Sequence, residues 1–272
     1  MKYSIITINY NNRDGLERTI QSVINQTYQD FEYIIIDGGS TDGSVDVIKK
    51  YADRIDYWVS EPDKGIYNAM NKGILQAHGE YLNFMNSGDC FYNDEVLENL
   101  LEILHYDIIL GKAYTNQMII SPKAPITLNN LCIYGFNHQA SFFIKELFID
   151  SLYDENYKLL SDWKFIVEKL IFEQRTNIIV DKFIVNYDLT GISSQNMEIA
   201  QKEQYVILSS LLPQGIYEDY LYFSKMRSPL MKYIPFISKT YRLHTFIIKL
   251  VRLVVKFYSF ITNKKFDYES NM

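Results

Sequence analysis

Along the first 190 residues, short apolar runs rich in isoleucine, tyrosine and phenylalanine alternate with stretches whose apolar residues recur at helical spacing. The short runs predict buried strands, and the longer stretches predict amphipathic helices. The first such pair is a strand at Tyr3–Asn9 and a helix at Asp14–Gln26, in which Leu16, Ile20 and Val23 share one face. This alternation is typical of an α/β fold in which crossover helices connect the strands of a layered sheet.

The later elements follow the same pattern less regularly. The other predicted strands are Phe31–Asp37, Asp56–Ser60, Glu80–Met85, Asp107–Leu110, Lys112–Ile120, Gln139–Ile144 and Thr176–Tyr187. The other predicted helices are Ser44–Tyr51, Gly65–Ala77, Asp94–Leu104 and Leu159–Phe172. Because the strand–helix rhythm weakens after the fourth strand, we expect a mixed topology there. The pattern becomes helical near residue 195, so we predict two parts, residues 1–195 and 196–272.

Charge is also divided between these parts. The 272-residue chain has a formal net charge of −6, yet residues 221–272 carry ten Lys and Arg against two acidic residues. Phe246–Ile261 predicts a helix on which Lys249, Arg252 and Lys256 form one basic stripe. Such a helix suits the headgroup region of an anionic membrane, and docking on the acidic body or in a dimer interface is the alternative. No nucleic-acid partner is predicted, because the body is acidic and no recognition motif occurs.

Two cysteines, Cys90 and Cys132, are too few for a disulfide framework or a four-thiolate zinc site. The apolar run at the N-terminus is too short for a secretory signal. We therefore expect a cytoplasmic protein, with peripheral attachment to the cytoplasmic membrane through the basic helix.

Polar turns follow three of the early predicted strands. They contain Asp37, the segment Glu61–Gly65 and the segment Asn86–Asp89, whereas the glycine-rich loops GxGxxG and GxxxxGK[ST] are absent from the sequence. The carboxyl ends of parallel strands meet at one edge of a sheet, which is where α/β proteins bind ligands. An acidic edge attracts a phosphate group only through a divalent cation, so the sequence predicts a diphosphate bridged by Mn²⁺ or Mg²⁺.

The segments SIITINYNN, IIIDGGSTDGS, EPDKGIYNAMNKGI and GEYLNFMNSGD, in this order, resemble the family 2 glycosyltransferases. The resemblance is dense over about the first 90 residues and extends more loosely, through HQASFFI and LLSDWKF, to roughly residue 190. It implies the GT-A fold, a Rossmann-like α/β/α sandwich with a mostly parallel central sheet, here followed by a helical tail. It also implies an inverting transfer of a sugar from a nucleotide donor, with UDP as the expected carrier.

The resemblance assigns donor-binding roles to residues at the strand ends. Asp37 is similar to the aspartate that accepts a hydrogen bond from the base, and Lys64 lies in a loop that approaches the base or the phosphates. The turn Asn86-Ser87-Gly88-Asp89 resembles the Asp-x-Asp metal motif, but Gly88 replaces its penultimate carboxylate, so Asp89 is the expected metal ligand. The nucleotide-binding residues implied in this way are Thr7, Asn9, Tyr10, Asn11, Asp37, Lys64, Asn86, Ser87 and Gly88.

The chemistry of an inverting transfer requires a general base, because the acceptor hydroxyl must lose its proton as the new bond forms. The segment Leu160-Ser161-Asp162-Trp163 resembles the acidic motif of the family, which implies that Asp162 is this base. His138 and Gln139 resemble a motif on the acceptor or pyrophosphate side. Simpler roles stay open: Asp37 as a turn former, Asp162 as a helix cap and His138 as a buried core residue.

The sequence thus predicts a metal-dependent inverting glycosyltransferase that acts on a glycan or polyprenyl-diphosphate-linked acceptor in bacterial surface polysaccharide synthesis. Two alternatives remain at this point. One is a nucleotidyltransferase, although the Gly-rich basic loop expected after the first strand is absent. The other is a non-catalytic nucleotide-sugar or glycan binding protein, which the Gly88 replacement favours.

Overall fold

The computed structural model describes residues 1–189, 196–225 and 241–262. The chain separates into two compact units, Met1–Ile207 and Leu208–Met272. The predicted boundary near residue 195 lies outside the described residues.

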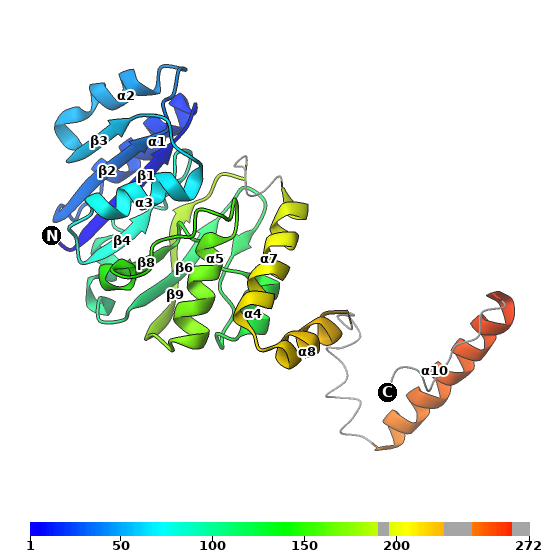
Figure 1. Ribbon diagram of the computed structural model, residues 1–272. Helices are drawn as coiled ribbons and strands as arrows, with labels where there is room; N and C mark the ends of the chain where they lie inside the picture. Colours follow the sequence, from blue (N-terminus) through cyan, green and yellow to red (C-terminus); the bar gives the residue numbers. More distant parts are fainter. Residues whose placement is uncertain (190–195, 226–240, 263–272) are drawn as a thin grey trace. The chain divides into compact units, whose positions relative to one another are not determined.

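The first unit is built on one sheet (Figure 1). Its strands are β1 (Tyr3–Asn9), β2 (Phe31–Asp37), β3 (Tyr57–Ser60), β4 (Tyr81–Phe84), β5 (Cys90–Phe91), β6 (Ile108–Tyr114), β7 (Ile119–Ile120), β8 (Ser141–Ile144) and β9 (Asn177–Asn186). Their order is β3-β2-β1-β4-β8-β6-β9-β5, with β7 paired to β6. The first four are parallel neighbours, whereas β8 runs antiparallel to both β4 and β6. The predicted α/β fold is confirmed, with the mixed part of the sheet where the sequence rhythm weakens.

The described α-helices are α1 (Arg13–Ile24), α2 (Ser44–Lys50), α3 (Ile66–Gln76), α4 (Leu128–Tyr134), α5 (Ser161–Val167), α7 (Met197–Leu211), α8 (Gln214–Lys225) and α10 (Tyr241–Thr262). After α5 the chain continues as a π-helical segment, Glu168–Phe172. The predicted tail helix lies within α10. None of the described helices is long and apolar enough to cross a membrane.

The predicted helix Asp94–Leu104 is wrong for its first turn, because only a 3-10 helix forms, at Glu98–Ile103. Tertiary hydrogen bonds divert the groups that an α-helix would use. The carbonyl of Asp94 accepts from Thr27 N at 2.7 Å, and Leu97 N donates to the side chain of Gln26 at 3.1 Å. The predicted strand break at Gly111 is also absent, since β6 runs through it.

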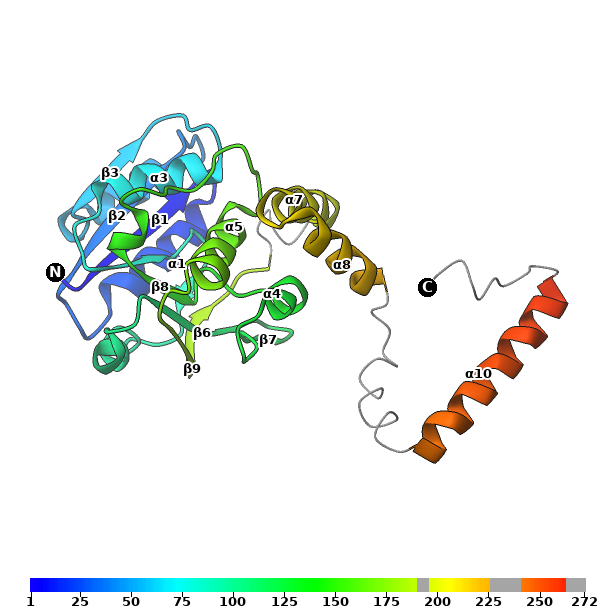
Figure 2. The ribbon, with the colours of Figure 1, turned by 60° about the horizontal axis from the view of Figure 1, so that its bottom comes forward.

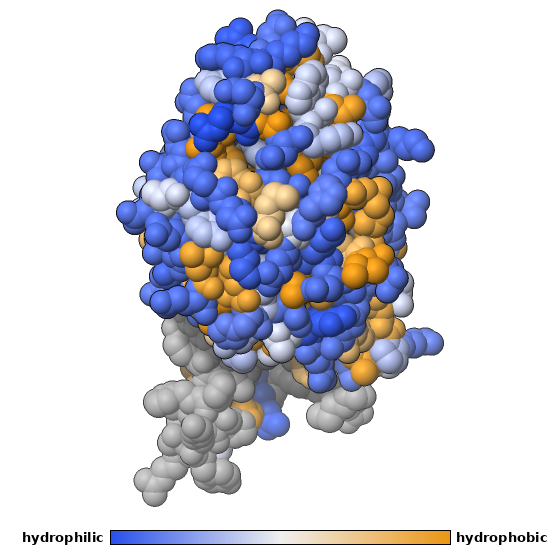
Figure 3. All heavy atoms as spheres, turned by 90° about the vertical axis from the view of Figure 1, so that its left-hand side faces the viewer, coloured by the Kyte–Doolittle hydropathy of each residue, from blue (hydrophilic) through white to orange (hydrophobic). Residues whose placement is uncertain are grey.

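Alternate residues of the central strands face two layers of helices. Tyr3 and Ile5 belong to a buried cluster with Leu16 of α1. On the other face of β1, Ile6 lies so close to Gly73 of α3 that a Cβ added there would be 2.5 Å from it. Figure 2 shows α1 and α3 on opposite sides of β1 and β2, which is the predicted sandwich. On the surface seen in Figure 3, hydrophilic residues predominate and hydrophobic ones show in patches between them.

A buried carboxylate holds the sheet together away from its carboxyl edge. Glu32 of β2 is 4% exposed and accepts hydrogen bonds from Ser4 of β1 and from the backbone N–H groups of His78 and Gly79, which precede β4. Burial raises the pKa of Glu32, but these hydrogen bonds outweigh it, so its pKa is lowered. Glu32 is therefore ionised and joins three segments.

Replacing this carboxylate tests the interpretation. We expect Glu32→Gln to lower the free energy of unfolding by about 2 kcal/mol at neutral pH, because a buried charged acceptor is lost. The ionised form of Glu32 contributes stability above its ordinary pKa and loses it as the pH falls through the lowered value. The difference from the wild type, measured by urea unfolding, should therefore shrink in acid. Glu80→Gln, at a carboxyl whose side chain is 42% exposed, is the control and should have little effect at any pH.

Candidate active site

The strand register brings polar residues together at the carboxyl edge of the sheet. Asn9 of β1 pairs with Asp37 of β2, and Asp37 pairs with Ser60 of β3. Asn9 Nδ2 donates to Asp37 Oδ1 at 2.7 Å, and Ser60 Oγ donates to Asp37 Oδ2 at 2.6 Å. Ser40, in the loop after β2, donates through its Oγ and its backbone N at 2.6 and 2.9 Å. Asp37 is thus the centre of this edge.

These hydrogen bonds leave Asp37 without a free acceptor position. The side chain is fully buried, and four donors occupy the four lone-pair positions that a carboxylate offers. Burial raises its pKa, but the hydrogen bonds from Ser40, Ser60 and Asn9 outweigh this effect and lower the pKa. Thr7 is fully buried as well, and its hydroxyl donates to the carbonyl of Met85 at 2.7 Å. Both side chains organise the sheet edge from within.

A second carboxylate lies in front of this edge. A Cβ built on Gly38 would be 2.5 Å from Asp63 Oδ2 and 3.2 Å from the ring of Tyr10, so only glycine lets these groups approach. The other oxygen, Asp63 Oδ1, accepts from Gly65 N at 2.9 Å. Tyr10 is 66% exposed. Lys64, next to Asp63, is exposed at the same loop. An aromatic ring and a carboxylate oxygen thus share the space above Gly38.

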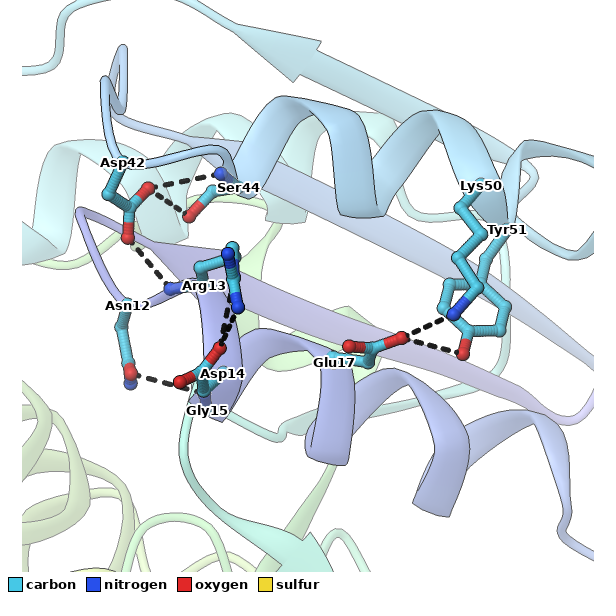
Figure 4. A network of polar contacts seen from close by, with 9 residues as sticks. All are labelled: Asn12, Arg13, Asp14, Gly15, Glu17, Asp42, Ser44, Lys50 and Tyr51. Carbon is cyan, nitrogen blue, oxygen red and sulfur yellow. Dashed lines mark hydrogen bonds and ion pairs between the residues drawn. The ribbon is translucent and has the colours of Figure 1, made fainter.

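The loops after β1 and β2 are fixed to each other. Asp42 accepts from Arg13 N at 2.8 Å and from Ser44 N and Oγ at 3.0 and 2.6 Å (Figure 4). Asn11, whose φ of 49° lies in the left-handed region that asparagine tolerates, donates its backbone N–H to Ser40 Oγ at 2.7 Å. The loops after β1 and β2 therefore form one hydrogen-bonded unit.

The turn Asn86–Asp89 lies beside the loop after β1. Asn12 Nδ2 donates to Ser87 O at 3.1 Å, and Gly88 N donates to Thr19 Oγ1 at 3.0 Å. Gly88 has a φ of 107°, and a Cβ there would be 3.3 Å from both Asn12 and the carboxylate of Asp188. A side chain at position 88 would be strained. The backbone conformation therefore explains why this motif has a glycine where the Asp-x-Asp motif has a carboxylate.

The carboxyl of Asp89 is 4% exposed and has a second carboxylate as its neighbour. Its Oδ1 accepts from Asp188 N at 2.8 Å. Burial, and to a smaller extent the charge of Asp188, raises the pKa of Asp89 to about 8. Two adjacent carboxylates with oxygen donors fit the chemistry of Mg²⁺ or Mn²⁺. In the described part of the chain no three His, Cys, Asp or Glu side chains gather as metal ligands, so diphosphate oxygens and water would complete the coordination.

Asp162 lies in the first turn of α5, on the face of the sheet that carries α3. Tyr67 of α3 donates its hydroxyl to Asp162 Oδ1 at 2.7 Å, and Trp163 N donates to the same oxygen at 2.8 Å. Burial, together with the charge of Asp162, raises the pKa of Tyr67 well above its ordinary value, so the phenol keeps its proton. Asp162 Oδ1 is thus held in place by two donors.

His138 lies inside an aromatic cluster. It is 4% exposed and stacks on Phe84 at 4.7 Å between ring centroids, and its Nε2 shares a hydrogen bond with Tyr153 Oη at 2.7 Å. Burial lowers the pKa of His138 and so keeps the ring neutral. The carbonyl of Gln139 accepts from Asn83 Nδ2 at 2.9 Å. The structure therefore surrounds His138 with aromatic core residues.

A pocket of about 370 Å³ opens next to Tyr67. It is lined by residues 64–68 at the start of α3, by residues 155–159 before α5, and by Asn196 and Ile199. Tyr67 both lines this pocket and contacts Asp162, so one side chain connects the pocket with the predicted base.

The model of the family described as "Glycosyl transferase family 2" matches residues 4–151. This chain belongs to that family. An uncharacterized glycosyltransferase of Mycobacterium tuberculosis is 34% identical over 208 residues, which cover 70% of this chain and 76% of the relative. A cholesterol galactosyltransferase of Borreliella burgdorferi is 24% identical over 252 residues, or 80% of this chain and 70% of that one. The chain is therefore a glycosyltransferase, and membership favours this function over the two alternatives.

Solved structures agree on the fold of this glycosyltransferase. TarS of S. aureus, in complex with UDP-GlcNAc, superposes with a TM-score of 0.64 at 21% identity and covers 80% of this chain and 69% of its own. The mannosyltransferase PcManGT of Pyrobaculum calidifontis, in complex with GDP-Man and Mn²⁺, has a TM-score of 0.61 at 12% identity and covers 97% and 88%. At these identities the likeness supports the GT-A fold alone.

Sequence reasoning missed several residues of this site. Asp188 follows Asp89 by 99 positions, and Tyr67 precedes Asp162 by 95. No local motif connects such pairs. Asp63 could have been predicted from the sequence, because it precedes Lys64 in the polar segment EPDKG.

Proposed function

We propose that this glycosyltransferase moves a sugar, with inversion, from a UDP donor to a hydroxyl of a glycan or polyprenyl-diphosphate-linked acceptor in bacterial surface polysaccharide synthesis. The observation that carries the proposal is the link from the pocket through Tyr67 to Asp162 at one edge of the sheet. It supplies a binding space and a carboxylate base next to each other. We propose that the acceptor enters this pocket.

In the proposed reaction the acceptor hydroxyl oxygen bonds to the anomeric carbon, and the bond from that carbon to the nucleoside diphosphate breaks. The proton of the hydroxyl passes to Asp162, which Tyr67 and Trp163 N hold in place on its other side. Asp89 and Asp188 would hold a Mn²⁺ or Mg²⁺ ion on the donor side. When bound, such an ion stabilises the negative charge that develops on the departing diphosphate.

Transfer assays test this assignment. UDP release from a panel of UDP sugars, measured with acceptor and with or without Mn²⁺, should depend on both additions in the wild type. Asp162→Asn should lower acceptor-dependent turnover by roughly 100- to 10,000-fold, because the proton acceptor is lost, and leave UDP affinity unchanged. Asp89→Asn should remove the effect of Mn²⁺. If Asp162→Asn turns over at the wild-type rate, Asp162 is not the base. If the wild type binds the donor but shows no turnover, the protein is a binding module.

For the donor base, we propose Asp63 rather than Asp37 as the acceptor of the uracil imide N–H. Asp37 was the sequence-based choice, but its four hydrogen bonds and complete burial disfavour it. Asp63 Oδ2 and the exposed ring of Tyr10 lie together above Gly38. A ring to stack on and a carboxylate to accept from are the two groups that a uracil base requires. Asn9 and Asn11 shape this space through their bonds to Ser40.

A modified nucleotide distinguishes the two aspartates. Asp63→Asn should weaken UDP binding in calorimetry by roughly tenfold, because a charged acceptor for the imide is lost. The wild type should discriminate against N3-methyl-UDP, whereas Asp63→Ala, which has no side-chain acceptor, should bind the two nucleotides alike. Asp37→Asn serves as the comparison: its main effect should be a lower melting temperature, because Asp37 holds the sheet edge together. Unchanged UDP affinity in Asp63→Asn would show that Asp63 does not bind the base.

We propose that the enzyme works on the cytoplasmic face of the membrane and attaches through α10. Lys249 and Arg252 lie on the same face of this helix, and its described apolar side chains include Phe246 and Leu253, which are 62% and 67% exposed. A helix with this pattern binds anionic lipid, with about 1 kcal/mol for each basic residue near the surface.

Vesicle sedimentation tests the attachment. The full chain should bind vesicles that contain phosphatidylglycerol and release at high salt. The double variant Lys249→Glu and Arg252→Glu should bind several-fold more weakly, because it reverses two charges near the anionic surface. Exchanging the charge at two residues of the first unit, Lys49→Glu and Lys50→Glu, is the matched control. If both double variants lose vesicle binding equally, the binding depends on the total charge of the protein and not on α10.

A further inference from the structure

Three backbone N–H groups that precede α5 point to one carboxylate on α7. Lys158 N donates to Glu203 Oε1 at 2.7 Å, and Leu159 N and Leu160 N donate to Glu203 Oε2 at 3.0 and 2.9 Å. Glu203 lies more than forty positions later in the chain, within the same compact unit. A carboxylate that accepts from several N–H groups forms strong, charge-assisted hydrogen bonds.

This segment leads directly to the proposed base. Leu160 is the residue that precedes α5, and its apolar side chain makes no capping hydrogen bond. Asp162 follows two positions later. Glu203 does not cap the first turn of α5, where Trp163 N donates to Asp162; it anchors instead the three residues that lead into the helix. Lys158 and Leu159 also line the pocket, so the same carboxylate holds one of its walls.

We propose that Glu203 is a positioning residue that sets the placement of Asp162 and of the pocket wall at 158–159. The inference rests on the proposed role of Asp162 as the base. Glu203 acts through the backbone of residues 158–160 and contacts neither the donor edge at Asp37 and Asp63 nor the turn at Asp89 in the described structure. Its loss should therefore affect turnover and leave nucleotide affinity intact.

The test compares two substitutions on the same helix of the full-length enzyme. Glu203→Gln removes the charge that faces the three N–H groups, and Glu198→Gln is the matched control, since Glu198 is 81% exposed and pairs only with Lys202 in the described structure. We expect Glu203→Gln to lower kcat by roughly 10- to 100-fold, as displaced catalytic groups do, and to change the Kd for UDP by less than about twofold. Glu198→Gln should match the wild type in both. Glu203→Asp, which keeps the charge on a shorter side chain, should recover part of the lost kcat.

Hydrogen exchange separates the anchor from the chemistry. In Glu203→Gln, but not in Glu198→Gln, the amides of residues 158–160 should exchange at least tenfold faster, while those of β1 and β2 keep the wild-type rate. If these amides exchange faster in Glu203→Gln but the wild type transfers no sugar, the proposed function is wrong, while the anchoring of residues 158–160 by Glu203 is confirmed. Unchanged exchange at 158–160, or kcat equal to that of Glu198→Gln, would overturn the proposal. A common fall in kcat, UDP affinity and melting temperature would also overturn it, since it would show a general structural role.

Discussion

The candidate site depends on the parallel register of three strands, which sets Asn9, Asp37 and Ser60 side by side at the sheet edge. The buried carboxylate of Asp37 is stable there only because four donors surround it, since an unpaired charge inside a protein is costly. Those donors come from three different segments. Satisfying one charge therefore fixes the relative positions of the loops after β1, β2 and β3, and the proposed base-binding groups Asp63 and Tyr10 lie on the surface that results.

The protein uses carboxylates in two different ways. Glu32, Asp37 and Glu203 accept several hydrogen bonds each and hold the fold or its loops in place. Asp89 is different, because Oδ1 accepts one backbone hydrogen bond, from Asp188 N, and burial raises its pKa to about 8. The carboxylates with several hydrogen-bond donors stabilise the fold. The carboxylate with a raised pKa, Asp89, is the one at which we propose a bound cation.

The two halves of the site differ in how their parts are connected. On the proposed donor side, the groups stand at the ends of successive strands, and short loops join them. On the proposed acceptor side, Asp162 contacts α3, and the segment before α5 is held by α7, so parts that are distant in sequence meet. Of these segments only α3 belongs to the densely matching part of the sequence, and the other two lie beyond it.

The sequence by itself determined the order of the early strands and helices and the family, because these follow from local periodicity and from motifs that span a few residues. It did not determine that four donors surround Asp37 or that Asp63 lies against Gly38. Nor did it determine the contacts of Asp188 with Asp89, of Tyr67 with Asp162 and of Glu203 with residues 158–160. It also predicted an α-helix from Asp94, where contacts to Thr27 and Gln26 leave only a 3-10 helix. Tertiary structure decided these points, since each depends on a hydrogen bond or a close approach between residues that only the folded chain brings together.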